Sequence, residues 1–289
     1  MLLSGEPTPV TVLVGGHESA DGADLVPLLD ALPHAVVSPS GRALQDALGA
    51  LLAAGGSAVV LPMTWGRDPS TVAETAKTLS WLASRGGAGR LSLCADFGTP
   101  DHLVSWLRRA ATQTAAGRPG AGVVIAAAAS NPFDDADLHR VAHLVRSHGA
   151  GVEVEVACLV DPGPDLARAV RRAQLLGSDD VVVVPAGFAR NAPGGLPPAH
   201  ASFFGPLLSE RAVLDIVRRR VSEAQHAMSH GDDGIAAGLM ADHGHGYAHS
   251  HDGEGGGHAH AHPHPGHDTP HETPRSRGTS PGEALSSSH

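Results

Sequence analysis

The chain contains 289 residues, carries a formal net charge of −10 at pH 7 and has only 3% aromatic residues. This length is sufficient for one large domain or two smaller ones with ample hydrophobic core. Because the charge is acidic and no basic stripe is present, a nucleic-acid partner is not expected. The two cysteines, Cys94 and Cys158, form no Cys-x-x-Cys pair, which is typical of a reducing compartment. We therefore predict a cytoplasmic protein.

No membrane partner is expected either. The sequence MLLSGEPTP at the start has no charged n-region and no long apolar core, so it does not predict a signal peptide. Residues 47–66 carry no charge and are long enough to cross a membrane. Glycines at 55–56 and Pro62 interrupt this stretch, however, and much of it is alanine and glycine. We interpret it as the end of a helix, a turn and a strand.

Strands and helices alternate along the chain. The first predicted strand, residues 12–14, ends in two glycines that are followed directly by His17. Leucines at helical spacing over 44–52 precede a valine-rich strand at 58–62, and a second amphipathic helix follows over 72–82. Alternation of continuous apolar strands with helices is typical of a parallel sheet that helices cover on both faces. The predicted fold class is therefore α/β.

The ordered part of the chain is an internal repeat. Four phrases recur in the same order, among them TVLVGGHESADGADL from Thr11 with VVIAAAASNPFDDADL from Val123, and VVLPMTWGRDP from Val59 with VVVPAGFARNAP from Val182. Such self-similarity predicts a duplicated domain. We predict a first α/β repeat over residues 1–117 and a second over residues 118–225.

The remaining residues, 226–289, differ in composition. Between 243 and 271 the chain has ten histidines among small, acidic and proline residues, too little apolar surface to offset the entropy of ordering. Neutral imidazoles bind cobalt, nickel, zinc and copper, so we predict a disordered metal-binding tail. The alternative is a solubilising tail or an expression tag. The predicted ligands are His243, His245, His249, His251, His258, His260, His262, His264, His267 and His271.

Candidate site residues follow the predicted strands. Ligands of parallel sheets bind beyond the carboxyl ends of the strands. His17 stands there after the first strand, Arg67 and Asp68 after the third, and His102 after Phe97-Gly98. Histidine has an ordinary pKa near 6.5 and its neutral form binds divalent metals, so His17 is a candidate base and ligand. The alternative is an ordinary loop residue next to a helix start.

These features resemble the class II tetrapyrrole metal chelatases of the CbiX type. The resemblance rests on the strand that ends in Gly-His, the "VP" strand with its glycine-containing loop, the duplicated half and the histidine-rich tail. It implies insertion of cobalt, or of iron or nickel, into sirohydrochlorin-type tetrapyrroles in cobalamin or sirohaem synthesis. The metal is then a substrate, and no organic cofactor is implied. The family's first histidine corresponds to His17, which the resemblance makes catalytic and metal-binding.

This chain departs from the family at two positions. Asp68 stands in the loop where a second histidine is expected, and Ser130 replaces the leading histidine in the second repeat. We therefore take Asp68 and His102 as the further candidate ligands at this site, with His200 as another substitute. If none completes the site, the alternative function is a non-catalytic cobalt- or nickel-binding or delivery protein on the same fold.

Two arginines are predicted to bind the substrate. A sirohydrochlorin-type ring carries carboxylates, and arginine pairs with a carboxylate through two parallel hydrogen bonds. Arg67 and Arg190 hold equivalent places in the two repeats and are expected to flank a central cleft. Their neighbours Trp65 and Phe188 are expected to pack beneath these loops.

Overall fold

The computed structural model describes residues 8–148, 151–197 and 199–241. The predicted ligands from His243 to His271 lie outside the described residues, so their metal binding stays a prediction. No helix of the described part is both long and apolar enough to cross a membrane. The uncharged stretch over 47–66 forms the end of α1, a turn and strand β3, as expected.

The chain forms two four-stranded sheets, and all of their strand pairs are parallel. The first half consists of β1 (Val10–Gly15), η1 (His17–Ala31), β2 (Ala35–Pro39), α1 (Arg42–Ala53), β3 (Ala58–Pro62), α2 (Pro69–Leu82), η2 (Ala83–Gly87) and β4 (Leu91–Leu93). The second consists of α3 (Pro100–Gly117), β5 (Ala121–Ala128), α4 (Pro132–Ser147), β6 (Val154–Leu159), α5 (Pro162–Leu175), β7 (Asp180–Pro185) and β8 (Ala201–Phe203). Two helices, α6 (Glu210–Ser229) and α7 (Ile235–Leu239), follow.

The two sheets share one topology. Their strand orders are β2-β1-β3-β4 and β6-β5-β7-β8, so each strand of the first sheet has a counterpart in the second. The predicted α/β class and the predicted duplication are confirmed. In both sheets the third strand in chain order pairs with the first, which brings the carboxyl ends of these two strands side by side.

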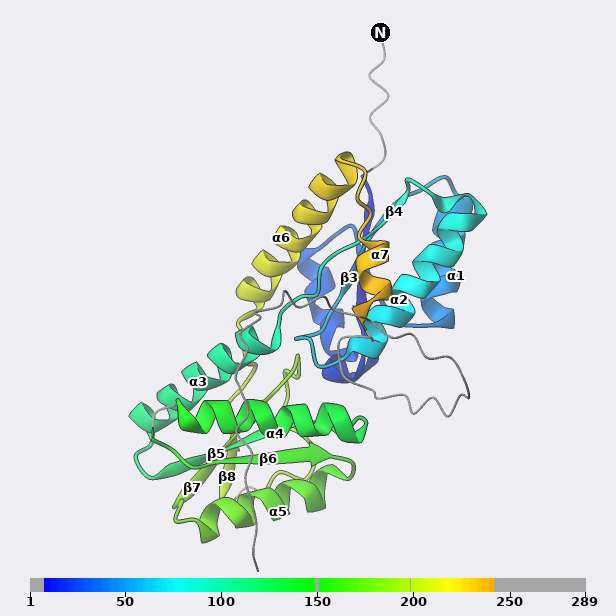
Figure 1. Cartoon of the computed structure of the whole chain (residues 1–289). Coiled ribbons are helices and arrows are strands. Elements are labelled where there is room, and N and C mark those ends of the chain that lie inside the picture. Colours follow the sequence, from blue (N-terminus) through cyan, green and yellow to red (C-terminus); the bar gives the residue numbers. More distant parts are fainter. Residues whose placement is uncertain (1–7, 149–150, 198, 242–289) are drawn as a thin grey trace, which may run out of the picture. The chain divides into compact units, whose positions relative to one another are not determined.

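Helices cover both faces of each sheet. In the first half, alternate strand residues pack against α1 and α2 on one face and against η1 and α6 on the other. In the second half, α5 covers one face, and α3 with α4 covers the other (Figure 1). The central strands β1, β3, β5 and β7 are buried on both faces along most of their length and are largely apolar, whereas the edge strands β2 and β6 are partly exposed.

The last helix of each sequence repeat packs in the other half. Helix α3, which ends the first repeat, contacts α4, β5 and β7, whereas α6, which ends the second, contacts β3 and β4. The boundary predicted at residue 117 therefore separates the sequence repeats but not the packed units. This exchange joins the halves twice and makes their cores one continuous cluster.

Regular structure continues past the tail boundary predicted at residue 225. That boundary falls inside α6, and α7 packs against α2 and β4. Ile235 is buried there, and the backbone N–H of Leu93 in β4 donates to the carbonyl of Asp233 at 2.8 Å. Ile235 and Leu239 thus attach to the core of the first half a segment that the sequence composition did not predict to be ordered.

Candidate metal and catalytic site

His17 and Asp68 meet at the carboxyl edge of the first sheet. His17 follows β1, and Asp68 follows the neighbouring strand β3 and caps the start of α2. The imidazole Nδ1 lies 3.1 Å from Asp68 Oδ2, and the backbone N–H of His17 donates to the same oxygen at 3.2 Å. A Cβ atom at Gly16 would lie 2.0 Å from that oxygen, so glycine is required directly before His17.

The carboxylate of Asp68 is firmly held. Thr71 donates its backbone N–H to Oδ1 at 3.0 Å and its hydroxyl to Oδ2 at 2.9 Å. Burial acts to raise the pKa of Asp68, but the hydrogen bond and charge of His17 and the two Thr71 hydrogen bonds outweigh it and lower this pKa. Asp68 is therefore a fixed anion beside the imidazole.

The pKa of His17 is shifted in the opposite direction. Burial acts to lower the pKa of His17, but the hydrogen bond to Asp68 and the negative charges of Asp68 and Glu18 raise it above 6.5. Because Nδ1–H donates to Asp68, the lone pair of the neutral ring lies on Nε2. This Nε2 is buried and has no hydrogen-bond partner among the described residues. An imidazole oriented by a carboxylate, with its other nitrogen unused, is suited to bind a metal or accept a proton.

Beside this pair lies a buried ion pair that the sequence analysis did not identify. Glu18 Oε1 lies 3.8 Å from Arg67 Nη1, and both side chains are almost fully buried. Glu18 Oε2 accepts hydrogen bonds from the Thr64 hydroxyl and from the backbone N–H of Trp65, the latter at 2.8 Å. Burial raises the pKa of Glu18, although Arg67 and these donors act against the rise. The signal that could have indicated Glu18 is a carboxylate directly after the strand-end histidine.

Arg67 connects the two halves of the molecule. Its guanidinium donates to the carbonyl of Ala186 at 3.3 Å and to the carbonyl of Asp134 at 3.5 Å, beyond the ends of β7 and β5. The carbonyl of Glu18 accepts from the N–H of Phe188 at 2.9 Å. The carboxyl ends of the central strands of both sheets therefore meet at one junction, with His17, Glu18 and Arg67 beside it.

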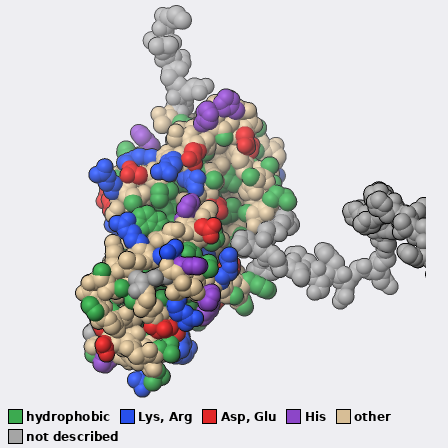
Figure 2. Space-filling view, turned by 60° about the vertical axis from the view of Figure 1, so that its left-hand side comes forward, with side chains coloured by type: hydrophobic (Ala, Val, Ile, Leu, Met, Phe, Trp, Pro, Cys, Tyr) green, Lys and Arg blue, Asp and Glu red, His purple; other side chains and the backbone are tan. Residues whose placement is uncertain are grey.

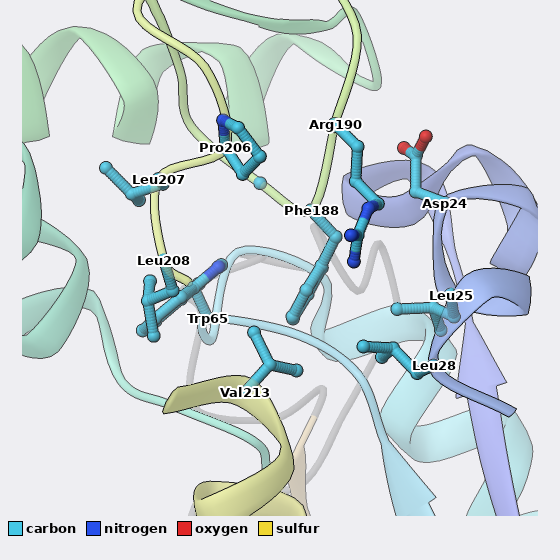
Figure 3. Close-up of a pocket in the computed structure, with 11 residues that line it drawn as sticks. Asp24, Leu25, Leu28, Trp65, Phe188, Arg190, Pro206, Leu207, Leu208 and Val213 are labelled. Carbon is cyan, nitrogen blue, oxygen red and sulfur yellow. The ribbon is translucent and has the colours of Figure 1, made fainter. Parts of the chain in front are cut away.

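Aromatic side chains fill part of this junction. Trp65 and Phe188 stack with ring centroids 5.9 Å apart, and Phe97 lies edge-on to each at 5.0 Å. The expectation that Trp65 and Phe188 pack under their loops is confirmed. The pocket beside these rings leaves about 20 Å³, enough for roughly one water molecule. Figure 3 shows Asp24 and Arg190 next to each other at one end of it, with apolar side chains around the rest.

Arg67 and Arg190 are not placed equivalently, contrary to the expectation from the repeat. The side chain of Arg67 is 1% exposed and pairs with the buried Glu18, whereas that of Arg190 is 30% exposed and pairs with Glu210 at 2.8 Å. Arg190 also acts to lower the pKa of Asp24, which burial raises. Only Arg190 is thus positioned at the surface of the pocket, where a carboxylate could exchange with Glu210.

His102 does not join His17 and Asp68. Its Nδ1 accepts from the N–H of Thr99, and the Thr99 hydroxyl accepts from the N–H of His102, a capping box that starts α3. Within the described ranges, no three His, Cys, Asp or Glu side chains lie close enough to hold a metal ion. Of the three predicted ligands, His17 and Asp68 form a pair, whereas His102 is separate because its side chain caps the N-terminus of α3.

No family model matches the sequence, and a search of curated proteins finds no match. Among solved structures, the chain is similar to SirB from Bacillus subtilis with Fe3+, at 17% identity over 76% of this chain and 97% of that chain, with a TM-score of 0.48. It is also similar to an ABC transporter solute-binding protein from Conexibacter woesei, at 14% identity over 79% of this chain and 83% of that chain, with a TM-score of 0.47. Neither likeness is close enough to assign a function.

Proposed function

We propose that this protein is a metal chelatase of the cytoplasm that inserts a divalent metal ion into a sirohydrochlorin-type tetrapyrrole during cobalamin or sirohaem synthesis. Cobalt is the metal we favour, with iron and nickel as alternatives, and the metal is a substrate. The observation that carries the proposal is the His17–Asp68 pair, in which the buried Nε2 of His17 has no hydrogen-bond partner within the part of the chain that the structure describes.

The pair supports both tasks that metal insertion requires. A base must take the pyrrole N–H protons, and a ligand must bind the metal weakly enough to release it. Neutral His17 can do either through Nε2, while Asp68 orients the ring and stabilises the imidazolium after proton transfer. A transfer site must keep open coordination positions, and two side chains leave several. We propose His102 as a further ligand; Asp68 becomes the second metal ligand only after it releases Nδ1 of His17, because it lies on the side of the ring opposite to Nε2.

Substrate access to His17 requires the junction to open, because its Nε2 is buried. The pocket that Arg190 lines is also too small, at about 20 Å³, since sites for ligands of ordinary drug size have volumes of about 300–1,000 Å³. Besides the exchanged helices and the shared core, the contacts of Arg67 and Glu18 join the two halves at this junction. We propose that release of these contacts opens the junction beside His17, and that Arg190 then binds a substrate carboxylate. Arg67 can take the same role only when its contacts to the second half are released.

The proposed function is tested by absorbance spectroscopy with sirohydrochlorin and cobalt. The purified full chain should convert the free ring to its metal complex faster than the same mixture without protein. Iron and nickel are compared under the same conditions. A rate equal to the uncatalysed rate with all three metals would exclude the chelatase.

Asp68→Asn is expected to move the pH profile of metal insertion to lower pH. The rate requires neutral His17, so it should rise as the pH passes through the pKa of His17, which Asp68 raises. Asparagine removes the charge and the carboxylate acceptor, so this pKa falls and the midpoint of the rise moves with it. The maximal rate should also fall, by about 10- to 100-fold, because the ring is less well oriented.

Asp101→Asn is the matched control, since Asp101 is an exposed carboxylate in the first turn of α3. It should leave the midpoint and the maximal rate unchanged. An unchanged midpoint in Asp68→Asn would show that Asp68 does not act through His17.

A second candidate function is non-catalytic binding or delivery of cobalt or nickel. Two observations favour it: the described residues hold no group of three ligands, and the sequence over 243–271 contains ten histidines. Such a protein would bind metal and leave the tetrapyrrole unchanged in the absorbance experiment.

Replacing the ten tail histidines by asparagine in the full chain is expected to slow cobalt insertion only when cobalt is scarce. A flexibly tethered metal reservoir raises the local metal concentration, to the millimolar range for short linkers. At saturating cobalt this adds nothing, so the two chains should have equal rates. Rates are measured across a cobalt titration, with a chain that ends at Ala241 as the second comparison. Equal rates at every concentration would exclude a reservoir, and loss at saturating cobalt would make the tail part of the site.

A further inference from the structure

The last turn of α6 carries two histidines on one face. His226 and His230 are one helical turn apart, and their ring centroids lie 4.7 Å from each other at an interplanar angle of 78°. Both side chains are exposed. They belong to none of the sites considered above, and histidine side chains are visible at the molecular surface in Figure 2.

We propose that His226 and His230 form a binding site for one divalent transition-metal ion, with water in the remaining coordination positions. Two imidazoles at this helical spacing point to one side, so both can reach the same ion, as in the His-x-x-x-His arrangement of zinc enzymes. Neutral imidazole suits zinc, copper, nickel and cobalt. Exposure leaves both rings free to rotate their nitrogens toward the ion and leaves room for water.

The position of His226 and His230 at the C-terminal end of α6 also favours binding of a cation. The carbonyl end of a helix carries a partial negative charge that favours a cation. His226 lies in the last turn of α6 and His230 caps it. Glu223, three residues before His226, carries a further negative charge but is paired with Arg220 at 3.0 Å. Binding of the metal ion therefore depends on the two imidazoles and on the partial negative charge at the C-terminal end of α6.

A second histidine pair of the same spacing has different surroundings. His139 and His143 on α4 line a pocket together with Arg146 and Glu155, which are paired with Glu153 at 3.3 Å and with Arg172 at 2.7 Å. The Nε2 of His143 also lies 3.4 Å from the Ser147 hydroxyl. This pair provides the matched control.

The site is tested by nuclear magnetic resonance of the isotope-labelled full chain during titration with Co²⁺, continued beyond the amount that the tail histidines take up. In the wild type and in His139→Gln/His143→Gln, the paramagnetic ion should broaden the backbone signals of residues 223–231. In His226→Gln/His230→Gln these signals should stay sharp. Each single replacement should weaken the apparent affinity by about tenfold or more, since loss of even an indirect metal contact costs 10- to 100-fold.

Two results would overturn the proposal. One is equal broadening in His226→Gln/His230→Gln, which would place the ion on another group. The other is absence of broadening in the wild type at saturating Co²⁺. Neither outcome depends on chelatase activity, because the readout is binding of Co²⁺ alone. Both replaced side chains are exposed, and the unbroadened spectrum of each variant reports directly that its fold is kept.

Discussion

His17→Ala is expected to lower the rate of cobalt insertion into sirohydrochlorin by about a hundredfold or more, the effect of removing a positioned acid–base group. The reason is the unused Nε2, which the hydrogen bond of Nδ1 to Asp68 keeps as the basic nitrogen of the ring. The rate is measured by absorbance at saturating cobalt and sirohydrochlorin, so that a change in binding does not imitate a change in chemistry.

His34→Ala is the matched control for this experiment, because His34 is an exposed turn histidine outside the proposed site. The control should keep its rate within a few-fold. His102→Ala is measured beside them, and a loss of rate in this variant is the result expected if His102 is a further ligand. Full activity of His17→Ala would reject the role of His17.

Arg67→Met is expected to destabilise the protein by about 3–5 kcal/mol, the usual result of leaving one partner of a buried ion pair alone. Glu18 would remain buried without its cation, and the carbonyls of Ala186 and Asp134 would lose their donor. The free energy of unfolding is measured by denaturant titration at neutral pH. Because the pKa of Glu18 is already raised by burial, the loss should be smaller at low pH, where Glu18 is protonated.

Arg190→Met is the matched control, since the Arg190–Glu210 pair is partly exposed. Pairs of this kind contribute about 0.2–1 kcal/mol. The double variant Glu18→Gln/Arg67→Met removes both charges and should recover part of the lost stability. Equal effects of Arg67→Met and Arg190→Met would mean that the two arginines have the same role, as the sequence repeat predicted.

The sequence alone determined the α/β class and the duplication of the fold. Valine-rich strands that are apolar on both faces need helices on both sides of the sheet. The same alternation of strands and helices recurs in each half. The sequence also placed His17 and Asp68 at strand ends, and the order of parallel strands brought them together, because the first and third strands are neighbours. Periodicity is a property of short segments, so it can be read from the sequence, whereas the pairing of the first strand with the third came from the structure.

Only the tertiary structure decided what lies between the two halves. Nothing in the sequence marks Glu18, Thr64 and Arg67 as buried residues. They are buried because the carboxyl edge of one sheet packs against that of the other. Two arginines at equivalent repeat positions have different environments because Arg67 pairs with the buried Glu18, whereas Arg190 pairs with the partly exposed Glu210. Likewise, the exchange of α3 and α6 joins residues that are far apart in the chain. Such contacts depend on long-range geometry, which no local sequence pattern contains.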